Sequence, residues 1–439
     1  MWRSSSSPTG VVPGQKERVG TVKSNSVRTV QAAVVAVALL AAACSTTAPE
    51  TTDEASGDGE AAAAPATTAT EVDIEPPPDP GVVVDEALAA LTVEEKVGQL
   101  LMPVLAGSSA DEVDPADAAL NRQISGLERP ADIVDAFHLG GVLYLENNIE
   151  SAEQLGRLSS GLQAAARTTG GPELLIAVDQ EGGRVNRITD QVTVFPAASD
   201  LAGNIDAVTE ASYVTGQQLQ RQGINVVLAP VADVVLPGLP GFIGDRSFGD
   251  DPQMVADMVS GSIVGLQQSG VAAAVKHWPG HGATSTDSHL SLPELDVDRR
   301  QWDKRERVPF DAAIDHDVAI VVVGHLAVPG LDGSGTPATL SSVIIDDLLR
   351  RELGFDGVVM TDALNMGAVG QFDAGRISVD AIMAGADVLL VPPDLAASYE
   401  ALLAAATDGS LSADRLDRSV RRVLMLKYKL GLLPGQGDG

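Results

Sequence analysis

The sequence predicts an α/β protein whose main domain is a single (β/α)8 barrel of the TIM type. Eight apolar or β-branched runs recur after residue 82, and segments of helical character lie between most of them. Continuous apolar strands that alternate with helices are typical of a parallel sheet buried on both faces. Eight repeats in about 350 residues fit a barrel with insertions better than a doubly wound sheet. No Gly-x-Gly-x-x-Gly motif follows the first strand, which argues against a dinucleotide-binding fold.

The predicted elements follow one another in a regular order, because short apolar runs indicate strands and longer amphipathic segments indicate helices. Strands are expected at residues 97–105, 141–145, 174–178, 225–235, 271–275, 318–323, 357–360 and 386–391. Helices are expected at residues 152–166, 205–222, 252–269, 341–352 and 395–407. An amphipathic helix rich in Arg, Lys and Leu at 415–431 closes the barrel. The domain is therefore predicted to span residues 83–434, with a short tail at 435–439.

The N-terminal 43 residues have the pattern of a secretory signal. Basic residues between positions 16 and 28 precede an apolar run at 30–43, which is shorter than the roughly 20 residues of a transmembrane helix. The single cysteine, Cys44, follows directly, as in a bacterial lipoprotein signal, so we expect Cys44 to be lipidated. The alternative is ordinary cleavage before a free or buried cysteine. Both alternatives predict an exported protein, at the outer face of the cytoplasmic membrane or in the cell wall.

Residues 44–82 are predicted to form a disordered tether. After Cys44 the segment consists mostly of Thr, Ala, Glu, Asp, Gly and Pro, and it has no aromatic residue and no apolar periodicity. Such a composition cannot bury enough apolar surface to offset the entropy of ordering the chain.

The charge balance excludes some partners. Sixty acidic residues stand against 29 basic ones, which gives a net charge of −31. This charge repels phosphate backbones and anionic membranes, so we expect no nucleic-acid binding and membrane contact only through the lipid anchor. A single cysteine also rules out an intrachain disulfide framework and a Cys-rich metal site.

Titratable residues gather where the predicted strands end, and those ends form one rim of a barrel, where chemistry takes place. The strand-end residues are Asp179, Asp233, Lys276 with His277, His325 and Asp362. The richest segment contains Lys276-His-Trp-Pro-Gly-His-Gly282 and then Asp287-Ser-His289, which places three of the chain's six histidines within 14 residues. We therefore expect this segment to bind a ligand, to transfer a proton, or both.

The residues alone leave several alternatives open. In an extended loop Asp287 and His289 point to the same side, so the carboxylate can orient the imidazole for general acid/base catalysis. The same segment could instead supply a metal site from its histidines and Asp287, or its histidines could brace the loop, as we expect for His281. Asp362 could be a functional carboxylate of the site, or its side chain could cap the N-terminus of a helix.

Two further alternatives concern the arginines. The two carboxylates Asp179 and Glu181, with Arg184, could bind a polyhydroxylated ligand, or an internal ion pair between Asp179 and Arg184 could hold the loop. Both could hold, with Asp179 on the ligand and Arg184 or Arg187 in support. Arg246, in the long loop after the fourth strand, could contact the ligand or only order that loop.

Taken together, these motifs resemble glycoside hydrolase family 3, and within it the β-N-acetylglucosaminidase branch. Four segments in the right order carry the resemblance, which extends from Leu91 to Leu433: residues 91–100, 178–185, 276–282 with 287–289, and 361–366. Thr361 departs from the family pattern, which more often has Asp or Ser there.

The resemblance implies a retaining mechanism with Asp362 as nucleophile and His289, paired with Asp287, as general acid/base. Retaining glycosidases usually use two carboxyl groups, and here the Asp287–His289 pair would replace the second one. The residues that the resemblance places on the sugar are Asp179, Arg246, Lys276 and His277. We expect Arg187 to contribute to sugar binding as well, in support of Asp179.

The expected protein is a monomeric exo-β-N-acetylglucosaminidase that needs no metal or organic cofactor. Its expected carbohydrate substrate is a muropeptide or another wall-derived glycan with terminal N-acetylglucosamine. The alternatives are a metal-dependent hydrolase built on the same rim, a wall-binding lipoprotein with a decayed site, and transfer of the sugar to phosphate instead of water.

Overall fold

The computed structural model describes residues 79–168, 170–239 and 241–435. The predicted signal, Cys44 and the predicted tether up to residue 78 lie outside these residues, as does most of the predicted tail. Among the described helices, none is long and apolar enough to cross a membrane.

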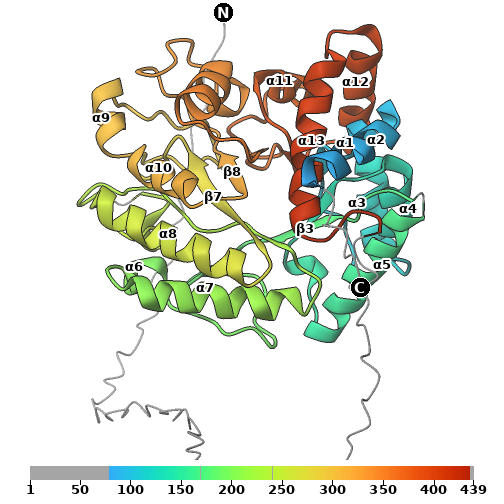
Figure 1. Cartoon of the computed structure of the whole chain (residues 1–439), viewed down its shortest axis with the longest axis horizontal. Helices are drawn as coiled ribbons and strands as arrows, with labels where there is room; N and C mark the ends of the chain where they lie inside the picture. The colour runs from blue at the N-terminus through green and yellow to red at the C-terminus, as the bar shows by residue number, and fades with distance from the viewer. Residues whose placement is uncertain (1–78, 169, 240, 436–439) are drawn as a thin grey trace, which may run out of the picture. The chain divides into compact units, whose positions relative to one another are not determined.

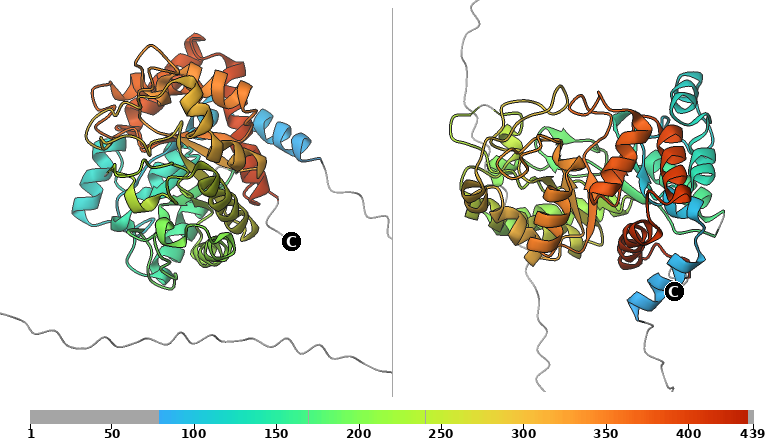
Figure 2. Two further views of the ribbon diagram at one scale, coloured as in Figure 1. Left: turned by 90° about the vertical axis from the view of Figure 1, so that its left-hand side faces the viewer. Right: turned by 90° about the horizontal axis from the view of Figure 1, so that it is seen from above.

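Parallel strands form the centre of the domain, and helices surround them (Figures 1 and 2). Six strands pair in the order β2-β3-β6-β7-β8-β9, and β1 pairs with β10. The two groups are joined on one side by the Met360–Val388 bridge, and on the other by the Leu143 N–H, which donates to Pro103 O at 2.9 Å. The fold is therefore a TIM-like (β/α) barrel, as predicted.

Each predicted strand segment overlaps an observed strand, and two of these strands, β7 and β9, run past the predicted end. The strands are β1 (Leu101–Met102), β2 (Gly141–Tyr144), β3 (Leu175–Val178), β6 (Val226–Val227), β7 (Ala272–Trp278), β8 (Ile320–Val323), β9 (Val358–Thr361) and β10 (Leu389–Leu390). Two predicted segments were too long. Residues 97 and 98 of the first segment belong to helix α2 (Val93–Gly98). The fourth segment pairs regularly only at Val226–Val227, after which Val231 forms a single bridge to Lys276.

The helices that the sequence predicted are also present. They are α5 (Ala152–Arg167), α7 (Ile205–Gln220), α8 (Pro252–Gln268), the π-helix η4 (Val343–Glu352), α12 (Leu395–Asp408) and α13 (Ala413–Lys429). The remaining helices are α1 (Pro80–Ala90), α2 (Val93–Gly98), α3 (Pro115–Ser125), α4 (Pro130–Phe137), α6 (Ala198–Leu201), α9 (Arg299–Lys304), α10 (Val308–Asp315) and α11 (Ala374–Ala384), with short 3-10 turns η1 (Glu146–Asn148), η2 (Gly244–Arg246) and η3 (Ala338–Leu340). A short hairpin, β4 (Gln180–Gly182) with β5 (Val185–Asn186), follows β3.

Alternate residues of each strand are buried on opposite sides, as the two-residue period of a strand requires. In β8, Ile320 and Val322 belong to the apolar cluster inside the barrel, whereas Val321 and Val323 belong to the cluster between strands and helices. Both faces of the sheet are therefore apolar, which is why the strands appear in the sequence as uninterrupted apolar runs.

The predicted tether extends too far. Helix α1 begins at Pro80, and the Asp79 side chain caps it by accepting the Gly81 N–H at 2.7 Å. Proline suits the first helical position because its missing N–H has no partner there anyway. Helix α1 packs on α13, with an ion pair of 2.7 Å between Asp85 and Arg421. Residues 80–82 are therefore helical, because tertiary packing stabilises a segment that its local composition alone does not order.

Candidate active site

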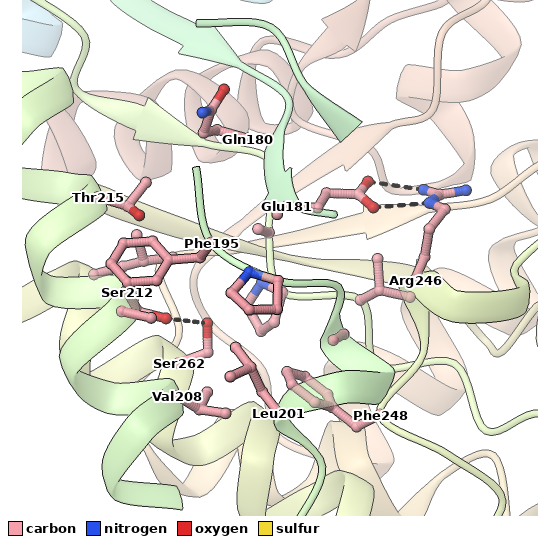
Figure 3. Close-up of a pocket in the computed structure, with 18 of the residues that line it drawn as sticks. Gln180, Glu181, Phe195, Leu201, Val208, Ser212, Thr215, Arg246, Phe248 and Ser262 are labelled. Atoms are coloured by element: carbon pink, nitrogen blue, oxygen red, sulfur yellow. Dashed lines mark hydrogen bonds and ion pairs between the residues drawn. The ribbon is translucent and has the colours of Figure 1, made fainter. Parts of the chain in front are cut away.

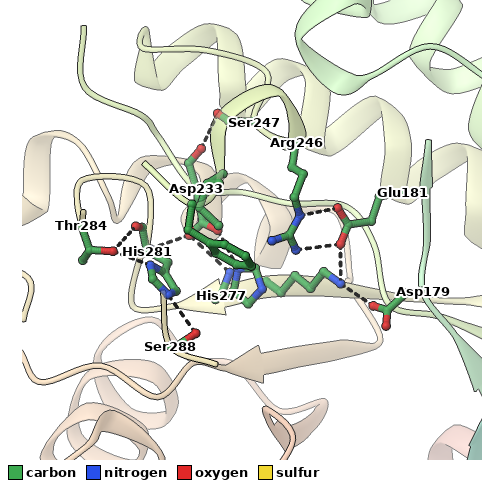
Figure 4. A network of polar contacts seen from close by, with 12 residues as sticks. Asp179, Glu181, Asp233, Arg246, Ser247, His277, His281, Thr284 and Ser288 are labelled. Atoms are coloured by element: carbon green, nitrogen blue, oxygen red, sulfur yellow. Dashed lines mark hydrogen bonds and ion pairs between the residues drawn. The ribbon is translucent and has the colours of Figure 1, made fainter. Parts of the chain in front are cut away.

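Polar residues at the carboxyl ends of the neighbouring strands β3, β6 and β7, and in the loops that follow them, form one network (Figure 4). Lys276 Nζ lies 2.7 Å from Asp179 Oδ1 and 2.7 Å from Glu181 Oε1. Arg246 makes two parallel hydrogen bonds to Glu181, of 2.7 and 2.8 Å. The structure thus joins Asp179, Arg246 and Lys276 through Glu181, which the sequence indicated only as the second carboxylate of the Asp179 motif.

Glu181 holds two cations in place. Burial alone raises the pKa of the Glu181 carboxyl, but Lys276 and Arg246 outweigh it and lower the pKa to about 2. Burial lowers the pKa of Lys276, whereas Asp179 and Glu181 raise it above its ordinary value. Glu181, Arg246 and Lys276 are therefore charged at neutral pH. The sequence signal for Glu181 was its place two residues after Asp179 in an extended segment, on the same side of the chain.

Apolar side chains support the Glu181–Arg246 pair from one side. Both residues line a pocket between the β4–β5 hairpin and helices α7 and α8 (Figure 3). Its other walls include Phe195, Leu201 and Phe248. Water screens an ion pair less where apolar groups surround it, so the position of Arg246 is strongly determined.

Asp233 orients the histidines of the β7 segment. Its carboxylate is fully buried, lies 2.6 Å from His277 Nδ1 and accepts the backbone N–H of His281 at 2.6 Å. Burial raises the pKa of Asp233, but His277 and the His281 N–H outweigh it and hold the pKa below its ordinary value. The carboxylate is therefore an acceptor, which places the proton on His277 Nδ1 and leaves Nε2 for a ligand. The sequence named Asp233 as a strand-end residue without this role.

His281 braces the loop, as expected. Its ring is buried, with Nδ1 2.6 Å from Thr284 Oγ1 and Nε2 3.1 Å from Ser288 Oγ. Burial lowers the pKa of His281, which favours the neutral ring. Both ring nitrogens of His281 therefore have hydrogen-bond partners, and the alternative metal site, built from the histidines of this segment and Asp287, does not form. Within residues 79–168, 170–239 and 241–435, no group of three or more His, Cys, Asp or Glu side chains could hold a metal ion.

Asp362 follows β9 directly, and its N–H donates to Val323 O at 2.8 Å. The next helix that the structure describes, α11, begins at Ala374 and is capped by Asp373, so the N-cap interpretation of Asp362 was wrong. Burial raises the pKa of Asp362, but the nearby His277 and His325, and the Ala363 N–H at 2.9 Å, outweigh it and lower the pKa. An ionised carboxylate at this position can act as a nucleophile.

Asp287 and His289 form the predicted pair. Asp287 Oδ1 lies 2.8 Å from His289 Nδ1 and accepts the His289 N–H at 2.9 Å. Burial raises the pKa of Asp287, but the contacts with His289 outweigh it and lower the pKa. The loop that carries the pair lies against the segment after Asp362, because the Gly367 N–H donates to His289 O at 3.1 Å. The pair thus reaches the rim from which Asp362 projects.

The two remaining arginines have other partners. Arg187 pairs with Glu146 in η1, and its N–H donates to Gln180 Oε1 at 2.9 Å. Its contact with sugar stays a prediction. Arg184 lies 2.9 Å from Asp245 and does not pair with Asp179, whose partner is Lys276. The internal Asp179–Arg184 ion pair was therefore a wrong expectation.

Comparison with known proteins agrees with this geometry. Residues 92–426 match the family described as "Glycosyl hydrolase family 3 N terminal domain". The chain is 35% identical over 344 residues to "Beta-hexosaminidase LpqI" of Mycobacterium tuberculosis, covering 74% of this chain and 85% of that protein. It is 31% identical over 373 residues to "Beta-hexosaminidase A" of Pseudoalteromonas piscicida, covering 78% of this chain and 62% of that protein.

Among solved structures, a glycoside hydrolase family 3 β-N-acetylglucosaminidase from Paenibacillus superposes with a TM-score of 0.72 at 40% identity, covering 78% of this chain and 63% of that one. The chain thus spans less than two thirds of the Pseudoalteromonas and Paenibacillus proteins.

Proposed function

The chain belongs to glycoside hydrolase family 3, and we propose that it is a retaining exo-β-N-acetylglucosaminidase. The names of its relatives support the reaction, since they are β-hexosaminidases and a β-N-acetylglucosaminidase at 31–40% identity. The observation that carries the proposal is the Asp287–His289 hydrogen bond, on a loop that contacts the segment after Asp362. This arrangement offers a nucleophile and a proton donor at one rim.

The proposed reaction has two steps. Asp362 attacks the anomeric carbon, while His289 Nε2 gives its proton to the departing oxygen, because Asp287 holds Nδ1. This step leaves a glycosyl-enzyme. His289 then removes a proton from water, which displaces Asp362 and retains the configuration of the sugar. No metal or organic cofactor takes part.

The proposed sugar-binding residues are Asp179, Arg187, Arg246, Lys276 and His277. Charged groups form stronger hydrogen bonds to hydroxyls than neutral groups do. The cluster of Lys276 and Arg246 with Asp179 and Glu181 presents both signs of charge. Asp179 is its most accessible carboxylate, with 19% of its side chain exposed, whereas Glu181 is 5% exposed. We infer that Asp179 contacts sugar hydroxyls and that Glu181 mainly holds the cations.

The proposed natural substrate is a muropeptide or another wall glycan that ends in N-acetylglucosamine, and the proposed location is outside the cytoplasmic membrane with a lipid on Cys44. The secretory pattern of residues 1–44 supports export. An exported glycosidase meets wall glycans directly, which is why we propose this substrate class. The protein is proposed to act as a monomer.

The test compares hydrolysis of an aryl β-N-acetylglucosaminide with that of the matching β-glucoside, for wild type and Asp362→Asn. We expect activity on the N-acetyl sugar only, reduced about a thousandfold or more in the variant. Preference for the glucoside would contradict the assigned branch. Retained activity in Asp362→Asn would remove Asp362 from the nucleophile role, and sugar 1-phosphate formed in phosphate buffer would replace hydrolysis with phosphorolysis.

A further inference from the structure

Phe242 contacts both His289, the proposed acid/base, and Arg246, a proposed sugar-binding residue. Its ring centroid is 5.2 Å from that of His289, at an interplanar angle of 58°, and Arg246 Cζ lies 5.2 Å from the same ring. One side chain therefore contacts both the proposed acid/base and a proposed sugar-binding residue. Aromatic pairs at centroid separations of 4.5–7 Å attract each other, so the contact with His289 is stabilising.

The backbone of Phe242 is held in place. Arg184 Nη2 donates to Phe242 O at 2.8 Å and to Ile243 O at 3.1 Å, and the Ile243 side chain is buried. The preceding Gly241 approaches the loop of His289 closely, since a Cβ atom there would lie 3.0 Å from Thr284 O. The loop that carries Phe242 is thus fixed against both the β4–β5 hairpin and the loop after β7.

The two partners of Phe242 differ in how firmly they are held. Arg246 has two hydrogen bonds to Glu181, and only 9% of its side chain is exposed. The His289 side chain is 58% exposed, and its ring forms a hydrogen bond to Asp287 through Nδ1. One hydrogen bond at Nδ1 leaves the imidazole free to swing about that edge. A second contact, on the ring itself, restricts the swing and so fixes the direction of Nε2.

We propose that Phe242 is a positioning residue for His289. The Phe242 ring, which Arg246 and the hydrogen bonds of Arg184 to the Phe242 loop hold in place, orients the imidazole so that Nε2 faces the departing oxygen. The inference rests on the proposed function. It assigns Phe242 to proton transfer and not to sugar binding, because Arg246 keeps its place through Glu181 whether or not the ring is present. A residue that only stabilises the loop would affect all substrates equally.

The test uses Phe242→Ala and Phe242→Tyr, with Leu239→Ala as the control, since Leu239 is a partly buried apolar residue of the same loop. The value of kcat/KM, which reports steps up to the glycosyl-enzyme, is measured for two aryl β-N-acetylglucosaminides. One has a phenol leaving group that needs protonation, and the other has a dinitrophenol that does not. The inhibition constant of free N-acetylglucosamine reports sugar binding, and the melting temperature reports folding.

For Phe242→Ala we expect kcat/KM to fall about tenfold on the phenyl substrate and less than about twofold on the dinitrophenyl substrate, which is the size of effect that an aromatic contact supplies. The inhibition constant of N-acetylglucosamine should stay unchanged. Phe242→Tyr should restore the phenyl rate because it keeps the ring, and Leu239→Ala should behave like wild type on both substrates.

Equal losses on both substrates, no loss on either, a changed inhibition constant, or failure of Phe242→Tyr to restore the rate would each overturn the assignment of Phe242. The proposed function is judged separately. If wild type is active and His289→Ala shows the leaving-group dependence that Phe242→Ala lacks, only this inference fails. If wild type itself cleaves neither N-acetylglucosaminide, the proposed function fails and takes this inference with it.

Discussion

The histidines of the barrel rim differ strongly in their access to water. His277, His281 and His325 are buried, with at most 6% of each residue exposed, whereas 58% of the His289 side chain is exposed. An acid/base that must first protonate a leaving group and then accept a proton from water needs this access. The buried histidines instead have fixed partners in Asp233, Thr284 and Thr339.

The first prediction concerns His289. We expect His289→Ala to lower kcat/KM about a hundredfold or more on substrates with poor leaving groups, because general acid catalysis contributes on that scale. Dinitrophenyl substrates should lose far less, since their leaving group departs without a proton. Steady-state kinetics on a series of aryl glycosides measures this. The control is His316→Ala, at the exposed C-terminal cap of helix α10. A loss that does not depend on the leaving group would remove His289 from the role.

The second prediction concerns Glu181 and pH. Its pKa is lowered from 4.5 to about 2 in the folded protein, so its stabilising contribution is complete above about pH 4.5 and disappears as the pH falls towards 2. Glu181→Gln should therefore reduce the free energy of unfolding by about 3 kcal/mol at pH 6 and weaken its pH dependence between pH 2 and 5. Urea unfolding of both proteins across this range is the measurement. Parallel curves for the two would contradict the account.

At the scale of elements, the site depends on the contact between two loops from different strands. The loop after β7 carries His289, and the segment after β9 carries Asp362. Their backbones meet through the Gly367 N–H to His289 O and the Ala368 N–H to Ser288 O, each 3.1 Å long. This contact, and not either loop alone, brings the proposed nucleophile and the proposed acid/base to the same rim.

The third prediction tests this contact with two glycines. A Cβ atom on Gly367 would lie 2.6 Å from His289 O and 2.7 Å from Leu290 O, so Gly367→Ala must displace the loop of His289. A Cβ atom on Gly370 would come no closer than 3.7 Å to its nearest neighbour, which makes Gly370→Ala a matched control. We expect kcat/KM to fall at least about tenfold in the first variant and to stay near wild type in the second, because small displacements of reacting groups are costly. Equal activity of the two variants would show that the loop contact is not needed.

At the scale of the whole molecule, the net charge of −31 opposes binding to anionic membranes. Attachment to such a surface would therefore require a covalent lipid. The fourth prediction is that the exported protein begins at a lipidated Cys44, and that Cys44→Ser moves it from the membrane fraction to the soluble exported fraction. Mass spectrometry of the N-terminal peptide measures this, and an unmodified Cys44 in membrane-associated wild type would refute the anchor.

Local patterns predicted the secondary structure well. Apolar runs marked the eight barrel strands, because both faces of the sheet are buried, and helical patterns marked α5, α7, α8, α12 and α13. The β4–β5 hairpin was not predicted. The errors lie where local signals compete. Thr92 and Glu95 form a capping box, which makes residues 93–98 helical despite the apolar run that starts at Val97. A capping box can be recognised in the sequence, but whether a helix forms after it also depends on packing.

The sequence by itself determined the succession of strands and helices, the family, and the type and order of the polar residues at the strand ends, because each depends on short-range pattern or on motifs. Only the tertiary structure decided which of these residues act on one another. Arg246 meets Glu181 across 65 positions, Lys276 meets Asp179 across 97, and His277 meets Asp233 across 44. Such contacts depend on the register of neighbouring strands and on the paths of the loops between them. Those features follow from the packing of the whole barrel, so no local segment specifies them.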